Sequence, residues 1–432
     1  MKRFTLLLFS AFLIFAQENP DPGPSRADAR QRARAVRAMA SQGQDAIPKI
    51  QPYLRDVDTQ VRLEAVKALD EIAGPKTVDA LVEAARDNDP EIQIRAADGL
   101  VNVYLPGYLK TGISGTLRRA GDSVRAKFTD TNDQIIDPYV EVPSPVIAVL
   151  GRQARGGVSF DSRANAARAV GILRGREAIP DLLEALNSKD GRLMYESLVA
   201  LQKIRDPAAG PGLAFLLRDL DEKVQVAALE ATGILRNQGA APNVREVLDR
   251  ARTTKIRRAA LSTLAMLADP ADHGVFLRYL NDKDDGLRAA AGEGLARLKN
   301  SADQPVLEKA FEAERSANTR LSLAFAVVSL GNRQISEFSP LQYLVNNLNN
   351  RAYRNVATAF LTEVCREVEV RQAIYPILTH ATRDEKTGMS VVLARSVDRD
   401  SVPYLEAMLQ DSDPEVMQEG TRSLRTLRTR VR

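Results

Sequence analysis

The sequence predicts an all-α fold, an α-solenoid of about a dozen helical hairpins with one insertion of about 39 residues. Three observations predict it. A motif returns every 31 or 32 residues: an Asp-rich turn, an aliphatic residue, and then small residues at helical spacing. Aromatic residues make up only 5% of the chain and Trp is absent, which suits helices that pack through small side chains. One interval between repeats is too long, which locates the insertion.

The aliphatic position of the motif marks each repeat. Strong copies fall at Val61, Ile92, Ser162, Leu193, Val224, Ile256, Leu287 and Thr319, and weaker ones at Ala29, Tyr353, Thr387 and Val416. The apolar residues of one unit share a single stripe of a 3.6-residue helix, as in Val61, Ala65, Ala68, Leu69 and Ile72. A shorter apolar pattern follows each stripe, so each unit is predicted to be a hairpin of a first and a second helix.

Proline and glycine mark the ends of these helices. Pro48, Pro180 and Pro403 stand near the predicted starts of second helices, where the fixed φ of proline is tolerated. Gly74 and Gly331 follow first helices, where a left-handed residue is usual. A lone hairpin cannot bury its apolar stripe, so neighbouring units are expected to stack into one continuous core.

The repeated motif resembles the HEAT repeat, especially the short bacterial HEAT-like subclass that also occurs in phycobilin lyases. The resemblance rests on residues 58–62 with their following alanines, and on residues 221–224 and 284–288. It implies a HEAT-like α/α superhelix over nearly all of the chain. It is almost silent about activity, because the same fold serves scaffolds, lyases and a few enzymes.

The Asp-rich turns have two interpretations. Asp before a first helix can accept hydrogen bonds from the free donors of the first turn, and a nearby Arg can pair with the Asp of the next unit. The alternative is calcium binding, since Asp87 and Asp89, or Asp411 and Asp413, place carboxylates at alternate positions. These turns lack the full calcium loop and its terminal Glu, which favours the structural interpretation.

The N-terminus predicts export. Lys2 and Arg3 precede an apolar run from Phe4 to Ala16, which is too short to span a bilayer and is typical of a secretory signal peptide. Retention of this run as an anchor is the alternative. We therefore expect residues 1–16 to be a signal peptide, residues 17–24 a Pro-rich linker, residues 25–104 and 144–432 HEAT-like repeats, and the mature protein to be periplasmic or extracellular.

The charge of the chain does not indicate nucleic-acid binding. The formal net charge is +4, and two of the basic residues, Lys2 and Arg3, belong to the predicted signal peptide, so the mature chain is nearly neutral. Arginines do crowd the first and last helices of the array. A solvated capping face is the simpler interpretation, and contact with an anionic lipid or wall polymer is the alternative.

Catalytic chemistry has little support in the sequence. Cys365 is the single cysteine, and only His380 in its neighbourhood could serve it as a base. The other histidine, His273, lies more than three repeats away. HEAT-repeat deoxyhypusine hydroxylases use several His-Glu pairs, but here His273 precedes Gly274 and His380 precedes Ala381. We therefore identify no catalytic, cofactor-binding or metal-binding residues.

The insertion, residues 105–143, is the remaining candidate for specificity. Insertions in solenoids lie on one face, often the binding face, although a loop that only covers core at a joint would look the same. Aromatic and Arg residues dominate binding hot spots, so the predicted partner contacts are Tyr108, Lys110, Arg118, Arg119, Phe128 and Tyr139.

Taken as a whole, the sequence predicts an exported, monomeric and non-catalytic scaffold. It would bind other proteins through a concave groove lined by second helices, together with the insertion. Two alternatives stay open: a lyase or other enzyme with a site at the insertion, and an adaptor that attaches to the envelope surface through the Arg-rich ends.

Overall fold

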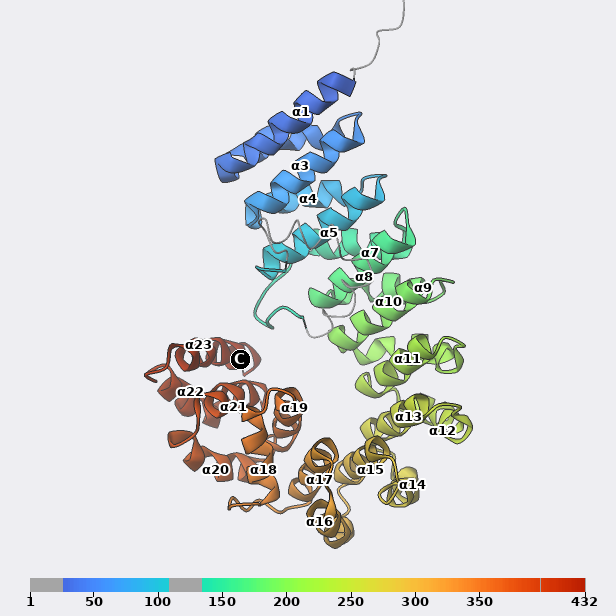
Figure 1. The fold of residues 1–432 in the computed structure, drawn as a ribbon, viewed down its shortest axis with the longest axis vertical. Coiled ribbons are helices and arrows are strands. Elements are labelled where there is room, and N and C mark those ends of the chain that lie inside the picture. The colour runs from blue at the N-terminus through green and yellow to red at the C-terminus, as the bar shows by residue number, and fades with distance from the viewer. Residues whose placement is uncertain (1–25, 109–133, 397, 432) are drawn as a thin grey trace, which may run out of the picture.

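The computed structural model describes residues 26–108, 134–396 and 398–431, and within these ranges the chain forms helices and no strands. The predicted alternation of first and second helices is present from end to end (Figure 1). The first helices are α1 (Arg26–Met39), α3 (Thr59–Ile72), α5 (Pro90–Tyr104), α8 (Phe160–Ile172), α10 (Gly191–Ile204), α11 (Glu222–Ile234), α13 (Thr254–Leu267), α15 (Asp285–Leu298), α17 (Ala317–Ser329), α19 (Arg354–Val364), α21 (Arg383–Ser396) and α23 (Pro414–Arg430).

The second helices are shorter and several contain a 3₁₀ turn. They are α2 (Ile47–Ile50), α4 (Val78–Ala84), α7 (Ser144–Gly156), α9 (Ile179–Ala185), the 3₁₀ helix η7 (Pro211–Arg218), α12 (Ala241–Arg250), α14 (His273–Tyr279), α16 (Gln304–Ala313), α18 (Pro340–Asn346), α20 (Val368–Ile374) and α22 (Val402–Met408). Buried side chains from Ala29 to Leu427 form one continuous cluster, so the core runs along the array. Within the described ranges, no helix has both the length and the apolar character that crossing a membrane requires.

Helix starts and ends follow the residues that the sequence marked. Asp58 begins α3 by accepting hydrogen bonds from the backbone N–H groups of Gln60 and Val61, and Asp89, Asp190, Asp221, Asp284 and Asp413 cap later first helices in the same way. The structural interpretation of these turns is confirmed. Pro48, Pro180 and Pro403 stand at the predicted helix starts.

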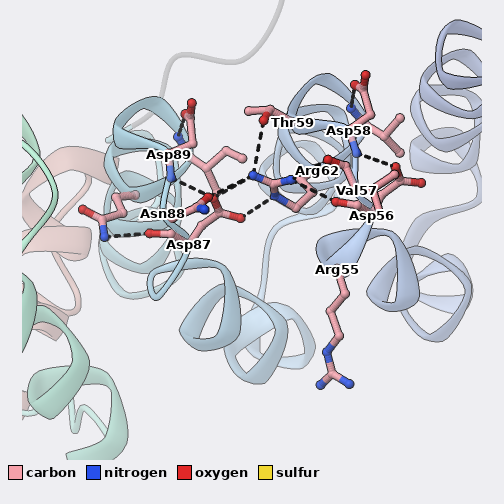
Figure 2. Close-up of polar contacts among 12 residues, drawn as sticks. Arg55, Asp56, Val57, Asp58, Thr59, Arg62, Asp87, Asn88 and Asp89 are labelled. Carbon is pink, nitrogen blue, oxygen red and sulfur yellow. Dashed lines mark hydrogen bonds and ion pairs between the residues drawn. The ribbon is translucent and has the colours of Figure 1, made fainter. Parts of the chain in front are cut away.

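Arginines join several of the turns to the next along the N-terminal ends of the first helices. Figure 2 shows Arg62 between two Asp-rich turns. Its Nε donates to Asp87 Oδ2 at 2.7 Å, and its Nη1 donates to the backbone oxygen of Asp56 at 2.9 Å. Arg32 bonds Asp56 and Arg288 bonds Glu314 in equivalent positions. We call this row of Arg-carboxylate contacts, centred on Arg32, Arg62 and Arg288, the turn ladder.

The solenoid curves toward its first helices. From α8 onward these helices lie on the inside of the arc, and α9, α12, α14 and α16 lie outside it (Figure 1). The expectation that second helices line the concave groove is therefore wrong. Small residues contribute to this curvature on the inner side, because a Cβ on Gly171 of α8 would stand 2.7 Å from Ala200 Cα of α10. First helices thus approach each other more closely than bulkier contacts would allow, and the array bends to that side.

Candidate functional site

The start of the insertion packs on the inner face of the array. Tyr108 is half-buried, and its hydroxyl donates to Asp98 Oδ1 of α5 at 3.5 Å. The same oxygen accepts a hydrogen bond from Asn165 Nδ2 of α8 at 3.1 Å. Burial, with the nearby Asp98 carboxylate, raises the pKa of Tyr108 far above its usual range. Tyr108 therefore serves as a neutral packing and hydrogen-bonding group.

A buried carboxyl lies near this contact. Glu196 of α10 is 1% exposed, and its Oε1 has no hydrogen-bond partner in the described part of the chain. Burial raises the pKa of Glu196, while Arg168 and Lys203 oppose that shift. A raised pKa favours the protonated carboxyl, and a raised carboxyl pKa is a property of general acids. Two shallow cavities among the described residues do not include Glu196.

Those two cavities lie in the later repeats. The larger, of about 420 Å³, is lined by Ser336, Glu337, Phe338, Gln342, Tyr343 and Asn346. The smaller, of about 140 Å³, lies where Arg297 and Lys299 meet Glu363 and Glu367. Its charged groups are joined to one another, because Arg297 bonds Glu363 at 2.9 Å and Lys299 bonds Glu367. Neither cavity brings together the groups of a recognisable catalytic site.

The end of the insertion joins two distant parts of the array. The backbone N–H of Ile136 donates to the carbonyl oxygen of Ile172, at the end of α8, at 3.0 Å. Asp137 accepts from Arg422 Nε of α23 at 2.9 Å. The guanidinium of Arg425 lies 5.1 Å from the ring centre of Tyr139. We call these contacts between residues 137–139 and α23 the clasp; they join positions that are 285 residues apart in the sequence.

The clasp is electrostatically favourable. Burial alone would raise the pKa of Asp137, but hydrogen bonds from Arg422 and Tyr139 leave it below its ordinary value. The hydroxyl of Tyr139 donates to Asp137 Oδ2 at 2.8 Å. Asp137 is thus a charged acceptor for both partners, and this arrangement orients the aromatic ring beneath Arg425.

The six predicted partner contacts of the insertion have different outcomes. Tyr108 and Tyr139 are placed, and each is engaged within the chain, at opposite ends of the insertion. Lys110, Arg118, Arg119 and Phe128 lie outside the described residues. The contacts of those four residues therefore stay a prediction, and the described part of the chain places the two tyrosines in intramolecular contacts. The clasp has no local signal in the sequence, because its two sides are almost the whole array apart.

The Arg-rich ends are only partly solvated. In α1, Arg32 pairs with Asp56, and Arg37 bonds the buried Glu64 at 2.8 Å. In α23, Arg428 pairs with Glu406 at 2.9 Å, in addition to the two arginines of the clasp. Most of these arginines still have exposed side chains, so the prediction of capping faces stands, and several of them also pair with carboxylates of neighbouring helices.

The groups weighed for catalysis are otherwise occupied. Cys365 is fully buried, and burial raises the pKa of its thiol to about 12, so the thiolate needed for nucleophilic attack is scarce at neutral pH. His273 Nε2 contacts Asp303 at 2.9 Å. Among the residues with described positions, no cluster of three His, Cys, Asp or Glu side chains is arranged to hold a metal ion.

Comparison with known proteins identifies the type of repeat. Residues 25–101 match the family described as HEAT repeats, and residues 162–188 match the PBS lyase HEAT-like repeat. These matches confirm the resemblance drawn from the sequence, and the solenoid described above confirms the fold class. No curated protein matches the chain.

Solved structures with similar folds have low sequence identity. An engineered protein is 19% identical, with 88% of this chain and 98% of that chain covered and a TM-score of 0.39. The complex of CpcE and CpcF of phycocyanin lyase from Nostoc sp. PCC7120 is 18% identical, with 62% and 92% covered and a TM-score of 0.37. Importin beta is 13% identical, with 88% and 57% covered and a TM-score of 0.37. At these scores the likeness says nothing about activity.

Proposed function

We propose that this chain, a solenoid of HEAT repeats, is an exported and non-catalytic scaffold that binds a partner protein along its concave face. The observation that carries the proposal is the row of first helices, from α8 to α21, along the inside of the arc (Figure 1). Extended concave surfaces of repeat proteins bind through many modest contacts, and specificity then comes from the pattern of exposed side chains.

The inner helices carry exposed charged groups beside half-buried aromatic and aliphatic groups. On α10 and α11, Lys223 Nζ lies 4.8 Å from the ring centre of Tyr195, and Val226 and Glu230 follow along α11. Burial of its carboxyl by the surrounding protein raises the pKa of Glu230, although the residue as a whole is exposed. We call Tyr195, Lys223, Val226 and Glu230 the inner patch. An aromatic residue among charges is a composition favoured at binding surfaces.

Site-specific cross-linking tests this assignment. A photo-reactive residue is placed at Val226 of the inner patch, and a matched one at Phe215, which is 55% exposed on the outer 3₁₀ helix η7. We expect envelope proteins to be captured from position 226 and not from position 215. Equal capture from both positions, or capture from 215 alone, would contradict a concave binding face.

The insertion is proposed to supply further contacts through Lys110, Arg118, Arg119 and Phe128. Deleting all of residues 105–143 would also remove the clasp, so the sharper variant replaces only residues 109–133 with a Gly/Ser linker of the same length. We expect this variant to lose partner affinity while it keeps the shape of the wild type in small-angle scattering. Unchanged affinity would contradict a role for these residues.

Export is a proposal that rests on residues 1–16 alone. Mass spectrometry of the protein recovered from cells should find a chain that begins near residue 17, in the periplasm or the medium. A chain in the cytoplasm that retains Met1 would contradict it. Light scattering of the mature protein should give the mass of a monomer.

An enzyme with a site at the insertion is the second candidate, and one observation favours it: the buried carboxyl of Glu196 near Tyr108 and the cations of α8 and α10. If this carboxyl serves catalysis, Glu196→Gln should abolish turnover of the substrate without weakening cross-linking from position 226. If it serves only packing, Glu196→Gln should stabilise the fold, because the amide removes a buried ionisable group.

A further inference from the structure

Four arginines gather where the array closes on itself. Arg174 follows α8 and Arg205 follows α10, while Arg395 lies in the last turn of α21 and Arg430 in the last turn of α23. We call these four residues the closure cluster. The clasp positions them, because Ile136 bonds the end of α8 and Asp137 bonds Arg422 of α23. Arg399 Nη2 also donates to the carbonyl oxygen of Val431 at 2.9 Å. This hydrogen bond holds the end of α23 near α21.

The four guanidinium groups are close enough to repel one another. Burial lowers the pKa of Arg174, and repulsion from Arg205 and Arg395 lowers it further. The pKa of Arg395 is lowered by burial and by repulsion from Arg430 and Arg205. The carboxylate of Glu419 opposes this shift. The pKa of Arg430 is also lowered, by burial and by repulsion from Arg174 and Arg205. Two helix ends from the middle of the chain and two from its C-terminus therefore share one concentration of positive charge.

These charges lack protein partners in the described part of the chain. No hydrogen bond or ion pair joins any of the four guanidinium groups to a carboxylate there, whereas Arg422, beside them, bonds both Asp137 and Glu419. Three of the four side chains, those of Arg205, Arg395 and Arg430, are open to solvent and Arg174 is half-buried. The cluster is thus accessible to a ligand and is not neutralised internally.

Two of the four residues also hold a strained backbone. Arg174 has φ of 53° and Arg205 has φ of 58°, in the left-handed region that Gly and Asn adopt more readily. Helix C-termini attract cations, but that attraction does not require four of them at one point. The same conformation recurs after other first helices, as at Ala73 and Ala268, so the feature that calls for an anion is the concentration of unpaired positive charge.

We propose that the closure cluster binds a small molecule that carries more than one phosphate group. Guanidinium groups donate paired hydrogen bonds to phosphate oxygens, and four of them match the charge of an oligophosphate better than that of a single carboxylate. A ligand here would bridge α8 and α10 to α21 and α23, so that it would reinforce the clasp. The site is separate from the inner patch, so its failure would leave the scaffold proposal standing.

Thermal unfolding with inorganic tripolyphosphate at low ionic strength tests the site. We expect the wild-type Tm to rise by roughly 5 °C at about 100-fold excess over Kd. The rise should vanish in the double variant Arg205→Gln, Arg430→Gln. It should persist in the control Arg30→Gln, Arg34→Gln, whose two arginines are exposed on α1. No rise in the wild type, or the same rise in the closure-cluster variant, would overturn the proposal.

Two further arms identify the source of the anion. Citrate at equal ionic strength should give a much smaller rise than tripolyphosphate, and an equal rise would overturn the assignment to phosphate. Wild type and the double variant should bind phosphatidylglycerol vesicles equally. Weaker binding by the double variant would mean that the cluster binds a lipid surface and not a small phosphate compound. Without ligand, the double variant should melt above the wild type at low salt, because it lacks the repulsion; a lower Tm would contradict an unneutralised cluster.

Discussion

The two edges of the solenoid use arginine in opposite ways. At the N-terminal ends of the first helices, the turn ladder holds each guanidinium against carboxylates and backbone oxygens, as Arg62 shows with Asp87 and Asp56. At the C-terminal ends, Arg174 and Arg205 have no such partner among the described residues. The difference teaches that the carboxylates within reach, and not residue type, decide whether an arginine stabilises the fold or remains available to a ligand.

The largest expected effect lies in the turn ladder. Arg62→Ala should lower the free energy of unfolding by about 3 kcal/mol, because it leaves Asp87 partly buried without its cation. The side chains of Arg62 and Asp87 are 12% and 8% exposed, which distinguishes this pair from surface pairs. Denaturant unfolding measures the loss. The matched change Arg34→Ala on α1 should cost less than about 0.5 kcal/mol, and equal costs would refute the contrast between buried and exposed arginines.

The second effect concerns pH. Hydrogen bonds from Arg288 hold the pKa of Glu314 below its ordinary value. A depressed folded-state pKa stabilises the protein above the unfolded-state value, near 4.5, and this contribution disappears as pH falls through the folded-state value. Glu314→Gln should therefore cost about 2 kcal/mol at pH 7 and much less at pH 3. A difference in Tm between the two proteins that stays constant with pH would contradict this.

At the C-terminal ends of the first helices, one substitution should stabilise the protein. Arg205→Gly removes a charge from the closure cluster and relieves a left-handed backbone, so without ligand the free energy of unfolding should rise by about 1 kcal/mol. Ala73 after α3 and Ala268 after α13 have φ of 52° and 54° at the equivalent position, so the array does not require an arginine there. A loss of stability in low salt would mean that Arg205 has a favourable partner, and the comparison between the edges would fail.

The smallest expected energy belongs to the clasp. Arg422→Gln breaks a pair that is half exposed, so it should cost no more than about 1 kcal/mol. Its effect on shape should be greater, because the clasp joins α23 to the middle of the array. Small-angle scattering should show a larger radius of gyration for Arg422→Gln than for the wild type, with Arg428→Gln as the control on the same helix. Unchanged dimensions would show that the array keeps its curvature without the clasp.

The sequence predicted the repeats because their physics is local. The stripe from Val61 to Ile72 and the cap at Asp58 depend on residues a few positions apart, so periodicity and capping rules find them. The direction of curvature depends on how closely neighbouring helices approach, as at Gly171 and Ala200, and a periodic pattern does not say which side of a hairpin contracts. Periodicity therefore does not tell whether the first or the second helices line the groove.

The candidate sites were less predictable than the fold. The clasp joins Asp137 to Arg422, and no rule of spacing relates residues that far apart. The closure cluster had a partial signal, because Arg174, Arg205 and Arg236 stand one repeat apart immediately after first helices, where glycine is usual. Their meeting with Arg395 and Arg430 depends on the curvature of the whole array.

The clasp also makes the two termini of the protein unequal. In a linear array each terminal repeat contacts one neighbour only, so both ends fray before the middle does. Here α23 is held by residues 137–139, whereas α1 packs against α3 and the 3₁₀ turn that follows it. A force applied to both termini should therefore unravel the array from α1 inward, and amide hydrogens in α1 should exchange with solvent sooner than those in α23.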